Sequence, residues 1–416
     1  MKKLKFTQKP KIMINKETNT IDIHMIFPTK YKPEEQFKID ILSNMLSYTT
    51  KQFPIEKDCN LAKIKKLIIK LRANTIMRGT NLFFIFQMQV PREGITKDFS
   101  LDDAFEMFVN TIYNPNSDGK SFNKEAFDRE ISAVKSSIES AEKNIYNSNY
   151  DDFLSKYDET ETISFSSLKH RNLIDEITPE NLYEFYKKII SVPSVNVVYG
   201  NTTRKRIIDL YKKYNLYKED TFEIEEDYWK ILKPKKKTLV DETKVPFNQS
   251  AIYYGYKINK YKKSDAIYIS VLCNLLDGPE CKVLFNKLRI ENQLVYHFDL
   301  STYTYCGAII FEIFCSKHNR EKVEEVLRNS IELLKDKSFL EYNIPRILKG
   351  MEYSLAYELD NDFVEFNRYL TKLLNSLPKS KELMEEFKKV DLDGFIDFVN
   401  RMQLDTICFK EGEKDE

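Results

Sequence analysis

The chain has 416 residues, which is too long for one ordinary hydrophobic core and suits two domains. Its 65 lysines and arginines nearly balance its 64 aspartates and glutamates, and a net charge of +1 argues against a nucleic-acid-binding protein. No apolar run approaches the length of a membrane span, and the basic start is not followed by the apolar segment of a signal peptide. We therefore expect a cytoplasmic protein whose six cysteines are free thiols.

The first half is predicted to open with a strand over residues 20–27, where apolar and polar residues alternate. His24 is on its polar face and is expected at the surface or between elements. A helix follows, because Pro33 suits a first helical position and apolar residues recur at helical spacing from Phe37 to Tyr48. The further elements expected are a helix over 61–71, a strand pair ending at 81–90, a helix over 100–113 capped by Ser100, a long helix from about 123 to 144, a less regular stretch, a helix over 178–190 capped by Thr178, and a strand over 194–201.

The second half repeats nearly the same order of elements. Its expected elements are a strand over 249–258, helices over 264–276 and 282–290, strands near 294–300 and 307–316, and a helix over 319–336 followed by more helices. Near the end, residues 391–412 repeat the pattern of residues 178–201, which is a helix, a short turn, a strand and a glycine.

This self-similarity predicts an α+β protein of two similar domains, each an antiparallel-rich sheet flanked by helices. The N-terminal domain is predicted to cover residues 1–215 and the C-terminal domain residues 246–416. Residues 216–245, with an acidic stretch and a lysine run, are predicted to be a solvated linker. Any α+β chain can be matched loosely to itself, but the closing helix and strand in both halves favour a true repeat.

The sequence contains no familiar catalytic motif. It has four histidines, of which the closest two, His297 and His318, are 21 residues apart, so no H-x-x-E-H or H-x-x-x-H pair can bind zinc from one helix. There is no G-x-S-x-G, P-loop or G-x-G-x-x-G, and there are only ten glycines. Zinc bound by distant single histidines and a Cys–His nucleophilic pair stay open, without a local signal for either.

One stretch of the second half, NLLDGPECKVLFNKLRIENQLVY, resembles a segment of the insulinase/pitrilysin-like metallopeptidases, the inverted zincins. The family pattern in the C-terminal domain is roughly LLGGGxxSxLFxxLRExxGLAY. The residues that match it are Leu275, Leu276, Gly278, Leu284, Phe285, Leu288, Arg289, Leu294 and Tyr296. Gln293 stands where glycine is usual, and Lys282 stands where serine is usual. The order of the two halves extends the resemblance over nearly the whole chain.

The resemblance implies that the family's zinc site is dismantled in the first half. An active member carries H-x-x-E-H on the helix after the first strand, where the histidines bind zinc and the glutamate is the general base. The matching stretch, DILSNMLSYTT, places Asp40, Ser43 and Asn44 at the first-histidine, glutamate and second-histidine positions. In the later helix that supplies a glutamate ligand, Glu130 is kept and Ser137 stands near the ligand position. We therefore expect no metal in this chain.

The resemblance also gives Arg289 and Tyr296 a candidate role. In the family, an arginine and a tyrosine of the C-terminal domain reach an opposing zinc site, where they help to hold the scissile region and the developing oxyanion. From the local pattern alone, Arg289 is a favourable cation in the last turn of a helix, and Tyr296 alternates with Leu294 and belongs in a core. His297 is expected to be exposed to solvent, with a substrate contact as the alternative.

The function implied is that of a non-catalytic subunit of a heterodimeric zinc peptidase. A homologous partner with H-x-x-E-H would hold the zinc, and this chain would supply Arg289 and Tyr296 for cleavage of a peptide substrate. By analogy, the substrates would include ribosomally made peptides that are matured by cleavage. A second class is a peptide-binding or scaffold protein of the same fold with no role in catalysis, and a gene for an H-x-x-E-H homologue next door would discriminate the two. A third is an enzyme with an unrecognised site, which stoichiometric zinc in the purified chain would reveal.

Overall fold

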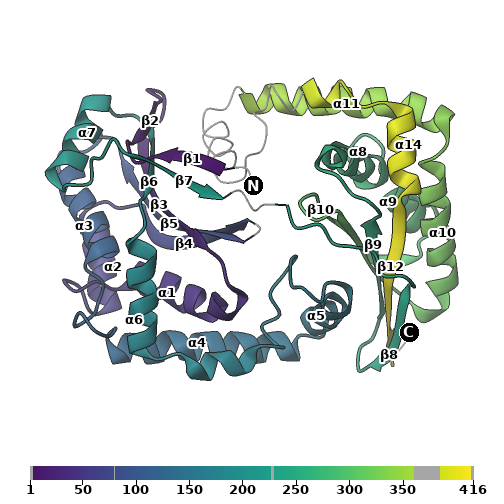
Figure 1. Cartoon of the computed structure of the whole chain (residues 1–416), viewed down its shortest axis with the longest axis horizontal. Coiled ribbons are helices and arrows are strands. Elements are labelled where there is room, and N and C mark those ends of the chain that lie inside the picture. The colour runs from purple at the N-terminus through teal and green to yellow at the C-terminus, as the bar shows by residue number, and fades with distance from the viewer. Residues whose placement is uncertain (1–2, 79, 226–228, 360–384, 414–416) are drawn as a thin grey trace. The chain divides into compact units, whose positions relative to one another are not determined.

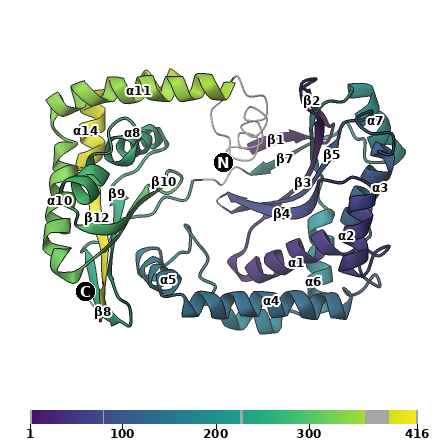
Figure 2. The same cartoon turned by 180° about the vertical axis from the view of Figure 1, so that it is seen from behind.

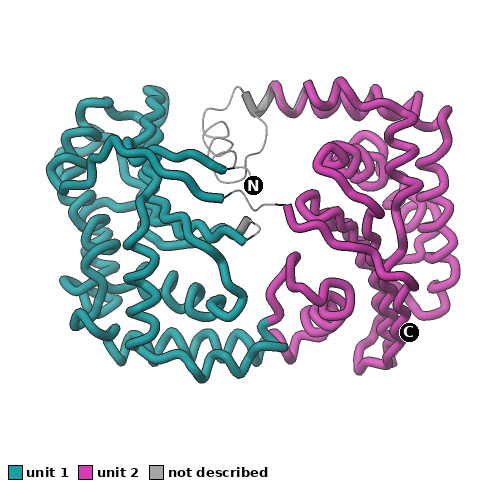
Figure 3. Tube along the Cα trace, in the orientation of Figure 1, with its two compact units in different colours: residues 1–140, 167–228, 373–376 teal, residues 141–166, 229–372, 377–416 magenta. Residues whose placement is uncertain are grey.

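The computed structural model of the chain describes residues 3–78, 80–225, 229–359 and 385–413 (Figure 1). Within these ranges, one compact unit comprises residues 3–140 and 167–225, and the other comprises residues 141–166, 229–359 and 385–413 (Figure 3). The boundary near residue 228 falls inside the predicted linker, which contains strands β7 (Thr221–Glu225) and β8 (Leu239–Val245). None of the described helices is long and apolar enough to cross a membrane.

The first unit is built on a five-stranded mixed sheet. Across the sheet the strands are β2 (Lys11–Ile14), β6 (Val195–Gly200), β3 (Thr20–Lys30), β5 (Asn81–Pro91) and β4 (Lys70–Arg78). Its helices are α1 (Gln36–Tyr48), α2 (Glu56–Lys65), α3 (Leu101–Tyr113), most of α4 (Lys124–Lys143), α6 (Pro179–Ile190) and α7 (Arg204–Lys213). A separate two-stranded sheet pairs β1 (Lys3–Thr7) with β7.

The second unit is built on another five-stranded mixed sheet. Across this sheet the strands are β8, β12 (Met402–Gly412), β9 (Ser250–Ile258), β11 (Ala308–Cys315) and β10 (Val295–Tyr303). The accompanying helices are α5 (Ile145–Tyr157), α8 (Ala266–Asp277), α9 (Val283–Phe285), α10 (Arg320–Leu333), α11 (Lys337–Leu359) and α14 (Leu392–Asn400). Strand β10 is at one edge of the sheet.

The two sheets share one topology. In the first sheet β2 runs parallel to β6, and the three other pairings are antiparallel. In the second sheet β8 runs parallel to β12, and the three other pairings are again antiparallel. The central strand of each sheet, β3 or β9, is followed by a single 3₁₀ turn and a helix, which are η1 (Pro33–Glu35) before α1 and η3 (Lys263–Asp265) before α8. The predicted repeat of two α+β halves is therefore confirmed.

Local signals located most helices correctly. Ser100 accepts a hydrogen bond from the backbone N–H of Asp103, and Thr178 forms a capping box ahead of α6. The helix predicted over residues 61–71 is wrong in its second half, because α2 ends at Lys65 and Leu67 adopts a left-handed conformation with φ of 53°. Leu71 therefore lies in β4 and not on a helix.

His24 is not at the surface, contrary to one of the expectations drawn from its polar strand face. It lies on β3, the central strand of its sheet, and is 6% exposed. Burial lowers the pKa of His24 to about 4, and the positive charges of Arg72 and Lys70 act in the same direction. His24 is therefore neutral at physiological pH.

Helix α5 was missed by sequence reasoning, which treated its residues as a less regular stretch. Asn144 caps it by accepting hydrogen bonds from the backbone N–H groups of Tyr146 and Asn147. Helix α5 lies on one face of the second sheet (Figure 2). Its Phe153 and Tyr157 pack there in a buried cluster with residues of β9 and β12. The opposite face of that sheet packs on α8, α10 and α14.

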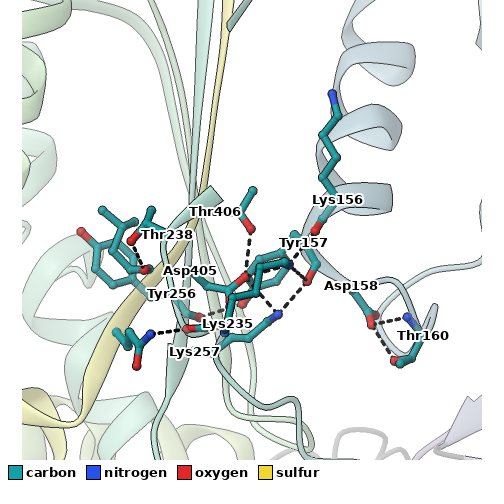
Figure 4. A network of polar contacts seen from close by, with 12 residues as sticks. Lys156, Tyr157, Asp158, Thr160, Lys235, Thr238, Tyr256, Lys257, Asp405 and Thr406 are labelled. Atoms are coloured by element: carbon teal, nitrogen blue, oxygen red, sulfur yellow. Dashed lines mark hydrogen bonds and ion pairs between the residues drawn. The ribbon is translucent and has the colours of Figure 1, made fainter. Parts of the chain in front are cut away.

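A buried ion network attaches two segments to the second sheet, as Figure 4 shows. The fully buried carboxylate of Asp405 is 3.0 Å from the ammonium of Lys257 and 3.2 Å from that of Lys235. Asp405 also accepts the backbone N–H of Lys235 at 2.6 Å, and Lys257 donates to the carbonyl of Tyr157 at 2.7 Å. The network thereby joins the end of α5 and the segment before β8 to β9 and β12.

Candidate functional site

Arg289 lies in a short π-helical turn, η4 (Asn286–Glu291), which continues α9. Its side chain is exposed at the surface. One guanidinium nitrogen, Nη1, donates to the carbonyl oxygens of Val295 at 2.5 Å and Tyr296 at 2.8 Å. Single π-helical turns occur often at functional sites, and this one directs Arg289 onto the start of β10.

The turn between η4 and β10 depends on an unusual backbone conformation. Gln293 adopts the left-handed region with φ of 51°, and the N–H of Leu294 donates to the carbonyl of Leu288 at 2.8 Å. Glycine reaches this region without steric cost, which accounts for the glycine of the family pattern at this position. Gln293 differs from the glycine of that pattern in residue type, but its backbone adopts the conformation that the turn requires.

Tyr296 is the extra residue of a β-bulge. The pairing of β10 with β11 shifts register between Val295 and His297, which leaves Tyr296 without a partner in the ladder. Its side chain is 48% exposed, and its hydroxyl lies 3.1 Å from the Oγ of Ser316. The interpretation of Tyr296 as a core residue, based on regular alternation, is therefore wrong, because the bulge turns the side chain outward. His297 is exposed as well, and its ring centroid lies 5.1 Å from that of Phe314.

The three residues at the positions of the H-x-x-E-H motif all lie on α1. Asp40 is half-buried and accepts a hydrogen bond from the amide Nε2 of Gln36 at 2.9 Å. Ser43 donates its hydroxyl to the carbonyl of Ile39 at 2.8 Å, and Asn44 is exposed. Burial raises the pKa of Asp40 to about 6, although the hydrogen bond from Gln36 opposes this effect. These side chains do not fit a zinc site.

The two α4 residues have different surroundings. Glu130 is buried and its carboxylate pairs with the Nε of Arg129 at 2.9 Å. Ser137 is exposed. Across residues 3–78, 80–225, 229–359 and 385–413, no group of three or more His, Cys, Asp or Glu side chains is placed to hold a metal ion.

Replacing Asp40 by asparagine is expected to raise stability at pH 8 by about 1–2 kcal/mol, because the variant removes a charge that burial disfavours. A raised pKa means that the folded wild-type chain binds the proton more tightly than the unfolded chain. Wild-type stability should therefore fall as pH rises from about 4, the unfolded pKa, to about 6, the folded pKa. Urea unfolding at pH 4.5 and pH 8 checks this, with the exposed Asp58→Asn as control. An equal pH dependence in all three proteins would contradict the prediction.

The comparisons with known proteins agree with this architecture. Residues 176–351 match the family described as the peptidase M16 inactive domain. A conserved protein from Enterococcus faecalis has the same fold with a TM-score of 0.81 and 17% identity, with 100% of each chain covered. A protease from Helicobacter pylori has a TM-score of 0.72 and 13% identity, with 99% of each chain covered. A peptidase M16 inactive domain from Pseudomonas fluorescens has a TM-score of 0.70 and 11% identity, covering 97% of this chain and 96% of that one. No curated protein matches the sequence.

The duplicated sheets and helices are thus those of the M16 proteases. Residues 176–351 match the peptidase M16 family, the insulinase-like proteins, through its inactive domain, and the fold of the chain as a whole is M16-like. This confirms the family resemblance found in the sequence.

Proposed function

We propose that the chain is the non-catalytic subunit of a two-chain zinc peptidase. A homologous partner with H-x-x-E-H supplies the zinc, the general base and the attacking water. This chain supplies Arg289 of η4 and Tyr296 at the start of β10, whose side chains are both exposed. Arginine offers a permanently charged donor fork and tyrosine a phenolic donor, and such donors stabilise an oxyanion when they are held in place before the reaction.

The observation that carries the proposal is the chemistry of α1. This helix follows the first long strand of its sheet, which is where active relatives carry the zinc motif according to the family pattern. Here Asp40, Ser43 and Asn44 replace the two histidines and the glutamate. Ser43 uses its hydroxyl within its own helix and Asn44 is exposed. The match to the inactive domain covers residues 176–351, which include Arg289 and Tyr296 but not α1.

The rigid support of Arg289 is a second argument. Its Nη1 donates to two consecutive carbonyl oxygens, and its Nε and Nη2 form no hydrogen bond within the described part of the chain. A guanidinium held in this way loses little side-chain entropy when it binds a further acceptor. The β-bulge likewise holds the phenol side chain of Tyr296 in an outward orientation from the strand.

The test is reconstitution with a candidate partner that carries H-x-x-E-H. We expect neither chain alone to cleave an unstructured leader-type peptide, whereas the mixture cleaves it and the two chains co-elute in size-exclusion chromatography. The matched control is the mixture with the partner's motif glutamate changed to glutamine, which should bind but not cleave. Full activity of the partner alone, or no association, would refute the proposal.

A peptide-binding or scaffold protein is the second candidate. It is favoured by β10, which is an edge strand and pairs only with β11 among the described strands. An edge strand can accept an extended peptide by strand addition. If this chain binds peptides and the partner cleaves them equally well without this chain, the peptide-binding or scaffold function would be favoured over that of a non-catalytic peptidase subunit.

A further inference from the structure

Two carboxylates face each other across β10 and β11. Asp299 and Glu312 are directly opposed in the register of these strands. Asp299 is exposed, and Glu312 is partly buried. Like charges at directly opposed positions destabilise a sheet. Although the chain has 65 lysines and arginines, neither carboxylate forms an ion pair within its described part, so the repulsion is not neutralised.

The surroundings of the pair are aromatic and not cationic. Glu312 is also directly opposed to Tyr253 on β9, and Tyr150 of α5 lies over Tyr253 with ring centroids 5.9 Å apart. The hydroxyls of Tyr150 and Tyr303, a residue of β10, lie 3.5 Å apart. Burial, and after it the charge of Asp299, raises the pKa of Glu312 to about 7, while Tyr253 acts in the opposite direction. No positive charge contributes to this pKa.

The hydroxyl of Tyr253 is a separate sign of a missing ligand. Tyr253 is completely buried, and its hydroxyl has no hydrogen-bond partner among the described residues. It faces Glu312 closely enough for each group to affect the pKa of the other, although the geometry does not make a hydrogen bond. A buried polar group without a partner costs about 1–3 kcal/mol, so such groups call for a functional explanation.

These features fit an organic cation. The two carboxylates supply negative charge for a cation, and the phenol of Tyr253 supplies a further oxygen as a hydrogen-bond acceptor. The tyrosine rings supply π-faces that attract cations. The described residues offer no third His, Cys, Asp or Glu that would complete a metal site here. We propose that Asp299, Glu312 and Tyr253 bind the side chain of a lysine or arginine in an extended peptide.

The place of the pair on β10 sets where that basic residue lies in the peptide. Asp299 is three residues beyond Tyr296, or about 10 Å along an extended strand. A peptide that pairs with the free edge of β10 brings a side chain next to Asp299, where opposite charges across strands attract. Taken with the proposed function, on which this point rests, the basic residue is about three positions from the part of the peptide that contacts Tyr296.

The test uses the purified chain alone and two fluorescent peptides that differ at one position, lysine against norleucine. We expect the lysine peptide to bind at least about 10-fold more tightly, and Glu312→Gln or Asp299→Asn to remove this preference. Glu325→Gln removes an exposed carboxylate on α10 and is the matched control that should keep it. The preference should also weaken below pH 7, as Glu312 takes up a proton.

Two outcomes would overturn the inference. Either wild-type chain binds both peptides equally, or the two amide variants keep the preference while their circular dichroism matches that of wild type. The binding assay needs no partner, so its result is separate from reconstitution. A lysine preference without cleavage by the assembled pair would leave this site standing and refute the proposed function. Cleavage without a lysine preference would refute this site and leave the proposed function standing.

Discussion

Replacing Arg289 by alanine is expected to lower kcat/KM of the reconstituted pair about 100- to 1000-fold, the loss typical of removing one oxyanion donor. The loss should appear mainly in kcat, because a donor directed at the oxyanion acts in the transition state more than in the ground state. Steady-state kinetics of the assembled pair on a single peptide measures it. Co-elution with the partner should be unchanged.

Three further variants separate catalysis from support of the turn. Tyr296→Phe removes only the hydroxyl and should cost about 10-fold or more in kcat, since a single donor is lost. Arg289→Lys keeps the charge but loses the guanidinium, which can donate to the two carbonyls and to a substrate oxygen at the same time, so it should retain only part of the activity. Lys287→Ala removes a nearby cation of the same π-helical turn and should have no effect. Full activity of Arg289→Ala and Tyr296→Phe would make both residues structural.

Replacing Asp405 by alanine is expected to destabilise the second unit by about 3–5 kcal/mol, because it leaves Lys257 buried without its anion. Burial alone would raise the pKa of Asp405, but hydrogen bonds and charges from Lys235 and Lys257 hold that pKa below its usual range. The network therefore stabilises the fold above the unfolded pKa of about 4, and this contribution is lost as pH falls through the lower, folded pKa. Urea unfolding at pH 7 measures the loss.

The control for this variant is Asp393→Ala, at an ion pair with Lys337 whose carboxylate side chain is 80% exposed. Exposed pairs contribute about 1 kcal/mol at most, so this variant should unfold almost as wild type does. Protease cleavage within α5 should also become faster in Asp405→Ala, because Lys257 and Lys235, the two partners of Asp405, donate to the last carbonyls of that helix. Equal unfolding midpoints for the two variants would contradict the role given to the network.

Much of the fold could be predicted because its signals are local. The capping residues Ser100 and Thr178 and the apolar stripes identify helices within a few residues, and the repeated closing helix and strand reveals the duplication. Helix α5 was missed because its stability comes from distant partners: Phe153 and Tyr157 pack on β9. Its own sequence is rich in polar residues and gives only a weak pattern.

The candidate site was predicted in part. The spacing of Arg289 and Tyr296 identified the turn, but no pattern in the sequence shows the bulge that exposes Tyr296. Asp299 and Glu312 escaped notice because their opposition depends on strand register, which links residues far apart in a hairpin. The sequence did contain one signal for this site, which is the single acidic residue, Glu312, in the otherwise apolar strand β11. Acidic residues are seldom buried in such strands without a partner or a function.

The matching topologies of the two sheets carry an evolutionary consequence. Leu67 before β4 has φ of 53° and Gln293 before β10 has φ of 51°, so both halves keep the same turn at the same point. Lys63, four residues before Leu67, takes the place of Arg289 and donates to the carbonyl of Ser47. A gene formed by fusion of two copies of one ancestor encodes each ancestral position twice. An assembly of two such chains therefore contains each ancestral position four times. In the proposed assembly, selection must preserve a single zinc helix and a single Arg/Tyr turn, which leaves α1 of this chain free to diverge.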